Sequence, residues 1–395
     1  MGEQIVLGLG DNIDYEIRWD SALLERLIRD ADLSASEINR DIEINTPRNL
    51  LASILGFVRN SSGGERFVQN PHLIEGFSGS FEKKITLGGT AVRAAIAMWK
   101  LGYTSAVHLV TMNEHVERLL PAGCPRLCSN RGISSYPHLI IQFNAGVRLD
   151  AGDIHIETVR PNRIIYTNDP DNALMCLHPD LPALLQDAKV FLISGFNTMQ
   201  DISLLEERLK QLRVMLEGLS KKILVFYEDS GFHREGISAI VRRFLLKYID
   251  IYSLNEDEMQ GYLGQPLALT DSKTVASALE DLYRIIPCPA LILHTRYWAL
   301  AYCPAGGAGD YAGPLLGGIT MATARFRFGD DFTCKDYAGT GALPREDRGT
   351  AFAGEIQALL GDRVCCVPSF LVPEKNVTTI GLGDTFAGGF LPALL

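Results

Sequence analysis

Long apolar runs, a positive net charge and a basic amino terminus are all missing from this 395-residue sequence. No uninterrupted apolar stretch approaches the ~20 residues that a helix needs to cross a bilayer. Acidic residues outnumber Lys and Arg by 47 to 37, and the net charge of −10 argues against nucleic acid or an anionic membrane as a partner. The start, Met1-Gly2-Glu3-Gln4, lacks the basic segment of a signal peptide. We therefore expect a cytoplasmic protein.

Paired cysteine motifs are also scarce. The eight cysteines are scattered, and Cys124 and Cys128 form the one pair whose spacing suggests a metal site. No second pair with zinc-finger spacing accompanies them. We predict eight reduced thiols, most of them packed as small apolar side chains.

Apolar runs alternate with helical patterns along most of the chain. Continuous apolar strands separated by helices are typical of a doubly wound, mainly parallel sheet that is covered on both faces. The expected strands are Ile5–Leu9, Ala106–Val110, Val190–Ser194, Ile223–Tyr227, Ile249–Ser253 and Ala290–His294. The expected helices are Ala91–Leu101, Asp201–Leu219, Glu235–Lys247, Glu256–Leu263, Lys273–Ile285 and Thr385–Leu394.

Two stretches break this alternation. Residues 15–87 are polar and hold helical patterns at Ser21–Asp30 and Pro47–Arg59, while residues 136–170 hold short strand-like pieces between turn residues. We expect these two excursions to form a smaller inserted α/β domain. The large α/β domain would then comprise residues 1–14, 88–135 and 171–395.

A glycine-rich motif near the end of the chain is the most informative feature of the sequence. Gly381, Leu382, Gly383 and Asp384 precede a run of small residues. The glycines permit a tight turn with positive φ and leave backbone N–H groups uncovered. A helix beginning just after them would add its positive dipole end, so the turn suits an anion such as a transferring phosphoryl group. Asp384 would sit beside it as a general base or, alternatively, as an ordinary helix N-cap.

Three further motifs precede it along the chain. Residues 7–14 end in Asn12-Ile13-Asp14, residues 88–91 place two glycines before an alanine-rich helix, and residues 255–258 form an Asn-x-x-Glu. With the motif at 381–384, this order resembles the ribokinase-like sugar kinases, and within them the ADP-dependent glucokinase and phosphofructokinase family. Residues 160–165 also resemble the sugar-side strand of the ADP-dependent branch. Together the matches run from residue 7 to residue 389.

The resemblance implies a ribokinase-like fold whose small domain is a lid that closes over a sugar. Closure would keep water away from the phosphoryl donor. The resemblance assigns sugar hydroxyls to Asn12 and Asp14, and close backbone approach to the ligand to Gly88 and Gly89. It gives Asp384 the role of general base. A turn aspartate at position 14 and close helix packing at the glycine pair are the alternative interpretations.

Magnesium binding is implied for Asn255, Glu258 and Glu228. Asn255 and Glu258 are three residues apart and so share one side of a first helical turn. Mg²⁺ prefers carboxylate, water and phosphate oxygens, and one or two carboxylates suffice. The same acidic run is also typical of a solvated helix N-terminus. Glu228 ends an expected strand where the ADP-dependent branch commonly has His-x-Glu, and Phe226 stands here in place of the histidine.

Arginines gather on the expected sugar side. Arg160 and Arg163 would suit the phosphate of a sugar phosphate, because a guanidinium binds phosphate bidentately. Asn162 between them would suit a sugar hydroxyl. Surface solvation is the alternative for each arginine, and it is the interpretation that we favour for Arg93 and Lys84, which lie near the glycine pair in sequence.

His294 and Thr295 end a strand on the expected nucleotide side and resemble the adenine-side strand of the family. A core strand with a polar end explains them equally well. The sequence thus predicts a Mg²⁺-dependent sugar kinase that transfers a phosphoryl group from ADP to a hexose or hexose phosphate, with both ligands being small molecules. The alternatives are an ATP-dependent carbohydrate or nucleoside kinase and a non-catalytic sugar- or nucleotide-binding paralogue. The second of these would have little reason to keep Asp384.

Overall fold

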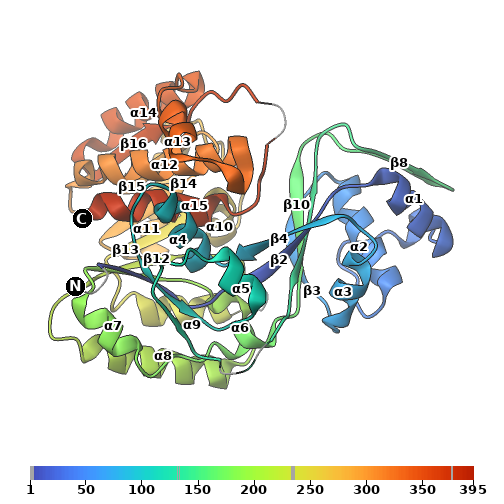
Figure 1. The fold of residues 1–395 in the computed structure, drawn as a ribbon. Helices are drawn as coiled ribbons and strands as arrows, with labels where there is room; N and C mark the ends of the chain where they lie inside the picture. Colours follow the sequence, from blue (N-terminus) through green and yellow to red (C-terminus); the bar gives the residue numbers. More distant parts are fainter. Residues whose placement is uncertain (1–3, 131, 133, 233–235, 375–376) are drawn as a thin grey trace.

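The computed structural model describes residues 4–130, 132, 134–232, 236–374 and 377–395, which form a large and a small sheet with their helices (Figure 1). Met1 to Glu3, and the expected helix start at Glu235, lie outside this part of the chain. Among the described residues, no helix combines the length and apolar character needed to span a membrane. The predicted α/β class with a doubly wound, mainly parallel sheet is confirmed.

The large sheet has the strand order β16-β15-β14-β13-β12-β11-β1-β5-β6. Its strands are parallel from β14 to β6, and β15 runs antiparallel to both of its neighbours. The carboxyl ends of the parallel strands therefore meet at one edge, where this fold places ligands. The strands are β1 (Ile5–Leu7), β5 (Ala106–Leu109), β6 (Arg126–Cys128), β11 (Val190–Ile193), β12 (Leu224–Glu228), β13 (Ile251–Asn255), β14 (Ala290–His294), β15 (Trp298–Tyr302) and β16 (Val364–Pro368).

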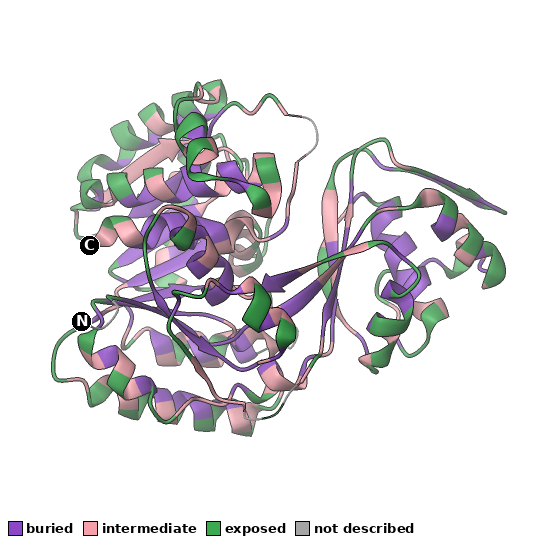
Figure 2. Ribbon diagram, in the orientation of Figure 1, coloured by how far each residue is buried: buried purple, intermediate pink, exposed green. Residues whose placement is uncertain are grey.

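Helices cover both faces of the large sheet, so its strands are buried along most of their length (Figure 2). One face packs against α7 (Leu181–Asp187), α8 (Ile202–Glu217), α9 (Ile237–Leu245), α11 (Ser272–Ile285) and α14 (Asp347–Leu360). The other face packs against α4 (Thr90–Lys100), α5 (Glu114–Leu119), α12 (Ala312–Phe328) and α15 (Leu382–Phe390). The remaining helices are α6 (Pro170–Leu174), α10 (Glu256–Leu263) and α13 (Cys334–Gly341).

The small sheet has the order β3-β10-β7-β2-β4 and an apolar core of its own against three helices. Its strands are β2 (Asn12–Ile17), β3 (Gly64–Phe67), β4 (Lys83–Gly88), β7 (His138–Phe143) and β10 (Asn162–Thr167), and a separate hairpin joins β8 (Arg148–Ala151) to β9 (Ile154–Glu157). The helices are α1 (Ser21–Asp30), α2 (Pro47–Arg59) and α3 (His72–Ser78). In Figure 1 these helices lie on the side of the sheet away from the large sheet.

Two local expectations were wrong. Residues 11–14 do not form a turn beyond the first strand, because Asn12–Ile17 is strand β2 and pairs with β4 on one side and β7 on the other. The last helix begins at Leu382 rather than Thr385.

The proposed division at residues 14/15 falls within β2, and the division at 87/88 falls within β4. The domain boundaries remain a proposal.

Candidate active site

Helix α15 begins at the carboxyl edge of the large sheet with a glycine N-cap. Gly381 has φ +61°, but Gly383 is helical, so the predicted tight turn over both glycines is wrong. Asp384 is the third residue of the helix rather than its N-cap. The first-turn N–H groups have no partners within the helix and lie at its positive end. This end of α15 can therefore hold an anion beside the Asp384 carboxylate.

The first residue of α4 contacts this carboxylate. Thr90 Oγ1 donates a hydrogen bond of 2.8 Å to Asp384 Oδ1, although the two residues are 294 positions apart. Gly89 caps α4 with φ +87°, and a Cβ on Gly88 would lie 2.3 Å from Asn12 Nδ2. The two glycine motifs thus meet. The Asp384 side chain is 24% exposed, so it is available to a ligand.

Asn12 and Asp14 reach the same place from strand β2. Asn12 Nδ2 donates to Asp14 Oδ1 at 2.5 Å, and Arg93 Nη2 donates to Asp14 Oδ2 at 2.5 Å. The Asp14 side chain is 6% exposed. A carboxylate has about four acceptor positions, so acceptor positions remain on both of its oxygens. The structure therefore brings Asn12, Asp14 and the glycine pair together next to Asp384.

Arg93 is not a solvated surface residue, and that expectation was wrong. Its side chain is 3% exposed and lies within 4 Å of carboxylates of Asp14, Glu16, Asp330 and Asp384. Burial alone would lower the pKa of Arg93, but these carboxylates raise it above its ordinary value. Opposite charges thus offset the cost of burying the guanidinium. The sequence signal was present, because Arg93 is the one charged residue between Thr90 and Trp99.

Lys84 fits the surface expectation better. Its ammonium group is half exposed and pairs with Asp330 at 3.5 Å and Asp331 at 3.4 Å. Sequence reasoning also missed Glu16 and Asp330, which line the cluster around Arg93. Nothing in their local sequence marks them as neighbours, because they lie on β2 and just after α12.

Glu228 and His294 form a largely buried pair beside Gly383, in the first turn of α15. His294 Nε2 lies 2.9 Å from Glu228 Oε1, and the imidazole stacks on Phe386 with ring centroids 4.8 Å apart. An imidazole therefore does contact Glu228, but from β14 rather than from position 226. Glu228 Oε2 is buried and has no hydrogen-bond partner within the described residues.

Asn255 and Glu258 form a capping box at the start of α10. The Asn255 amide oxygen accepts from the N–H groups of Asp257 and Glu258, and Glu258 Oε2 accepts from the Asn255 N–H at 2.8 Å. Burial, with the Asp229 carboxylate nearby, raises the pKa of Glu258 well above its ordinary value. The Asn255 side-chain oxygen is thus already used by the helix end. The charge of Glu228 also contributes to raising the pKa of Glu258.

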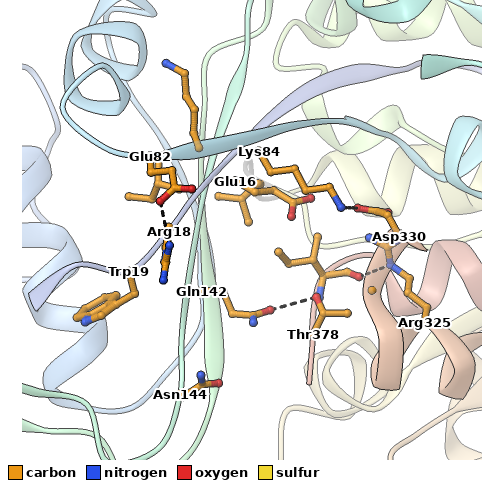
Figure 3. Close-up of a pocket in the computed structure, with 15 residues that line it drawn as sticks. Glu16, Arg18, Trp19, Glu82, Lys84, Gln142, Asn144, Arg325, Asp330 and Thr378 are labelled. Carbon is orange, nitrogen blue, oxygen red and sulfur yellow. Dashed lines mark hydrogen bonds and ion pairs between the residues drawn. The ribbon is translucent and has the colours of Figure 1, made fainter. Parts of the chain in front are cut away.

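A pocket of about 600 Å³ opens between the small sheet and the segment that leads into α15 (Figure 3). Glu16 and Gln142 line it from the small sheet, and Asp330 and Thr378 line it from the large domain. Gln142 Oε1 accepts from Thr378 Oγ1 at 3.1 Å and from the Thr379 N–H at 3.0 Å. The small sheet is thereby tied directly to the backbone that precedes Gly381.

Comparisons with known proteins identify the family to which this chain belongs. The model of the family described as the ADP-specific Phosphofructokinase/Glucokinase conserved region matches residues 3–301. The chain belongs to this family. The match identifies a sugar kinase of the ADP-dependent kind, and it ends before the motif at 381–384. A search of curated proteins finds no match.

Solved structures share the fold of this family member over its whole length. A phosphofructokinase from Pyrococcus horikoshii OT3, crystallised with AMP, is 18% identical with a TM-score of 0.76, covering 100% of this chain and 98% of that one. An ADP-dependent kinase in complex with fructose-6-phosphate and ADPβS is 16% identical with a TM-score of 0.74, covering 99% and 94%. The last common ancestor of ADP-dependent phosphofructokinases from Methanosarcinales is 17% identical with a TM-score of 0.71, covering 100% and 93%.

Three other predicted site residues, Arg160, Asn162 and Arg163, lie at and just before strand β10 of the small sheet. Arg160 precedes β10, and its Nε donates to Ser61 O at 3.0 Å. Arg163 pairs with Gln142 across β10 and β7, so the two side chains share the face that lines the pocket. Asn162 Oδ1 accepts from the Arg163 N–H at 2.9 Å. The structure thus separates the two arginines, with Arg163 on the cleft side.

Thr295 has a local partner. Its hydroxyl donates to Trp298 O at 2.9 Å and accepts from the N–H groups of Tyr297 and Trp298, so it closes the turn between β14 and β15. His294 is likewise held, by Glu228 and Phe386. Both residues lie at the carboxyl edge of the sheet, and a role in nucleotide binding stays a prediction for each.

The pair of His294 and Glu228 makes stability depend on pH. Burial alone lowers the pKa of His294, but the Glu228 carboxylate raises it above the ordinary 6.5. The stabilisation is fully present below pH 6.5 and is lost as the pH rises through the folded-state value. We expect His294→Asn to lower the free energy of unfolding by about 1.5–3 kcal/mol at pH 6 and by less at pH 9.

Urea titrations of both proteins at the two pH values measure this difference. His155→Asn is the matched control, because the exposed ion pair of His155 with Asp150 contributes little in solvent. An equal loss at both pH values would mean that the ring stack on Phe386, and not the charge on His294, stabilises the fold.

Proposed function

We propose that this kinase transfers the terminal phosphoryl group of ADP to a hydroxyl of a hexose phosphate, with Asp384 as the general base. The placement of Asp384 carries the proposal. Its partly exposed carboxylate lies in the first turn of α15, is oriented by Thr90, and stands next to the polar groups of Asn12 and Asp14.

The chemistry follows from these positions. Asn12 and Asp14 orient the acceptor sugar, and Asp384 accepts the proton of its attacking hydroxyl. The acceptor oxygen bonds to the terminal phosphorus of ADP while the bond from that phosphorus to the bridging oxygen breaks, which releases AMP. The N–H groups at the start of α15 stabilise charge on the transferred group. Positioning and electrostatic stabilisation do most of the work in such transfers.

Magnesium fits the carboxylates on the other side of the site. Glu228 offers a buried oxygen without a hydrogen-bond partner among the described residues, and its charge contributes to raising the pKa of Glu258. No group of three or more His, Cys, Asp or Glu residues that could hold a metal occurs in the described part of the chain. Mg²⁺ bound mainly by water and phosphates needs only one or two carboxylates, so we assign Glu228 and Glu258 to it and give Asn255 the role of orienting Glu258. When bound, Mg²⁺ would neutralise charge on the nucleotide phosphates.

A phosphorylated acceptor suits the charges of the small sheet. The chain carries a net charge of −10, so a phosphate needs a local cation. Arg163 lies on the cleft side of β10, next to Gln142 in register. One structural neighbour is a complex with fructose-6-phosphate and ADPβS, which is compatible with such an acceptor.

A coupled assay of donors and acceptors tests the function directly. Purified protein is given ADP or ATP with Mg²⁺ and a panel of free hexoses and hexose phosphates, and AMP is measured. We expect AMP to form with ADP and a hexose phosphate. Activity with ATP alone would make this chain an ATP-dependent kinase, and binding of nucleotide and sugar without turnover would favour the non-catalytic paralogue.

Replacing the general base gives the sharpest single test of mechanism. Asp384→Asn keeps the shape and the hydrogen bond from Thr90 but cannot take the proton, so kcat should fall by ~10²–10⁴ while ligand binding is retained. Steady-state kinetics and calorimetric titration with ADP measure the two effects. A variant with wild-type kcat would remove Asp384 from the mechanism.

The acceptor phosphate is tested by comparing two arginines. Arg163→Ala should raise KM for a hexose phosphate about tenfold or more, since a lost charge-assisted hydrogen bond costs ~1.5–3 kcal/mol. KM for the free hexose should change little. Arg160→Ala serves as the matched control, because Arg160 Nε is already hydrogen-bonded to Ser61 O. Equal effects of Arg163→Ala on both acceptors would make a free hexose the better substrate assignment.

A further inference from the structure

Arg93 joins three parts of the molecule that are far apart in sequence. Its Nη2 donates to Asp14 Oδ2 at 2.5 Å and lies 3.5 Å from Glu16 Oε1, both on strand β2 of the small sheet. Its Nη1 lies 3.7 Å from Asp330, which follows α12. Its Nε lies 3.7 Å from Asp384 on α15. One guanidinium therefore contacts carboxylates from three different elements while α4 supplies its backbone.

The same guanidinium also packs against the N-cap of α15. A Cβ on Gly381 would lie 2.7 Å from Arg93 Cδ and 3.0 Å from Arg93 Nη1, so only glycine leaves room for it. Gly381 also has φ +61°, a conformation that side chains other than that of glycine rarely adopt. The position of Arg93 and the start of α15 thus depend on each other.

Asp14 and Asp384 are like charges that the proposed reaction needs close together. The structure shows no direct contact between them among the described residues, and Arg93 touches both. Arg93 Nη1 is buried and forms no hydrogen bond within the described residues, so this donor has capacity left. Arg325 pairs with Asp330 and donates to Ile380 O at 2.7 Å, which holds the far side of the cluster.

We propose that Arg93 is a positioning residue that fixes the acceptor-holding carboxylate of Asp14 and the general base Asp384 in one reactive geometry. This inference rests on the proposed kinase function. Arg93 acts through the two aspartates. Lysine cannot replace it, because a single ammonium group does not reproduce the fixed fork of a guanidinium toward four carboxylates.

The experiment compares Arg93→Lys with Arg208→Lys in the full-length chain. Arg208 is a matched control, because its side chain is also about one-tenth exposed or less and hydrogen-bonded, but it lies on α8 and donates to Leu174 O. For each variant we would measure kcat, KM for the acceptor, KM for ADP and the thermal midpoint. Arg93→Lys retains a positive charge among the carboxylates and is thus the variant chosen to keep the fold.

We expect Arg93→Lys to lower kcat about 10²-fold, since small misplacements of reacting groups have effects of that order. KM for the acceptor should rise about tenfold, as for one weakened charge-assisted hydrogen bond, while KM for ADP stays within about twofold. Arg208→Lys should leave all three kinetic constants within about twofold of wild type. Wild-type kcat and acceptor KM in Arg93→Lys, or equal losses in the two variants, would overturn the inference.

A double-variant cycle separates positioning from a structural role. If Arg93 acts on the acceptor through Asp14, Arg93→Lys should add little to the acceptor KM of Asp14→Asn, whereas additive effects would overturn the inference. The thermal midpoints would show whether a loss of kcat reflects unfolding. An inactive wild-type protein in the donor and acceptor panel would overturn the proposed function itself, and with it this inference. An active wild type with an indifferent Arg93 would overturn the inference alone.

Discussion

The burial of one guanidinium constrains the arrangement of the whole site. Moving a cation out of water is costly unless opposite charges and hydrogen bonds replace its hydration. At Arg93 those charges come from β2, from the residues after α12 and from α15, so these elements must converge for the fold to form. The carboxylates depend on the cation in turn, because Asp14, Glu16 and Asp384 would otherwise repel one another. The geometry of the candidate active site is therefore a condition of folding.

Glycine provides the space for this convergence at two points. A side chain at Gly88 would collide with Asn12 and Asp14, and a side chain at Gly381 would collide with Arg93. In both places a polar side chain of the site occupies the space that a Cβ would fill. The glycine motifs thus have two consequences, since they expose backbone N–H groups and also admit functional side chains from elsewhere in the chain.

Much of the fold was predictable where local signals were strong. The bounds of α1, α2 and α10 agree with the expected ranges, because each begins after a capping side chain, Asp20, Thr46 or Asn255. Strand β2 was missed because its first residues have the composition of a turn, and pairing with β4 and β7 overrides that preference. The short strands β15 and β16 also depend on long-range pairing.

The site was predictable in its motifs but not in its contacts. Three of the four motifs point to Asn12, Asp14, Asp384 and their glycines, and the structure brings these together. No sequence pattern predicts that Thr90 contacts Asp384, which is 294 positions away. Nor does any pattern predict that the Asn255 side-chain oxygen accepts hydrogen bonds from the first N–H groups of α10. Arg93 was misjudged because a charged residue in a helix is usually solvated, and only the surrounding alanines indicated burial.

The hydrogen bonds of Gln142 to residues 377–379 bear on how such a kinase can diversify. Strand β7 of the small sheet and the segment before Gly381 are separated by more than 230 positions, yet they share three hydrogen bonds. If the small sheet of a distant relative replaced this one, residues 377–379 of the recipient chain would not match the new β7. An exchange of β7 between relatives would therefore lose these three hydrogen bonds unless residues 377–379 were exchanged with it.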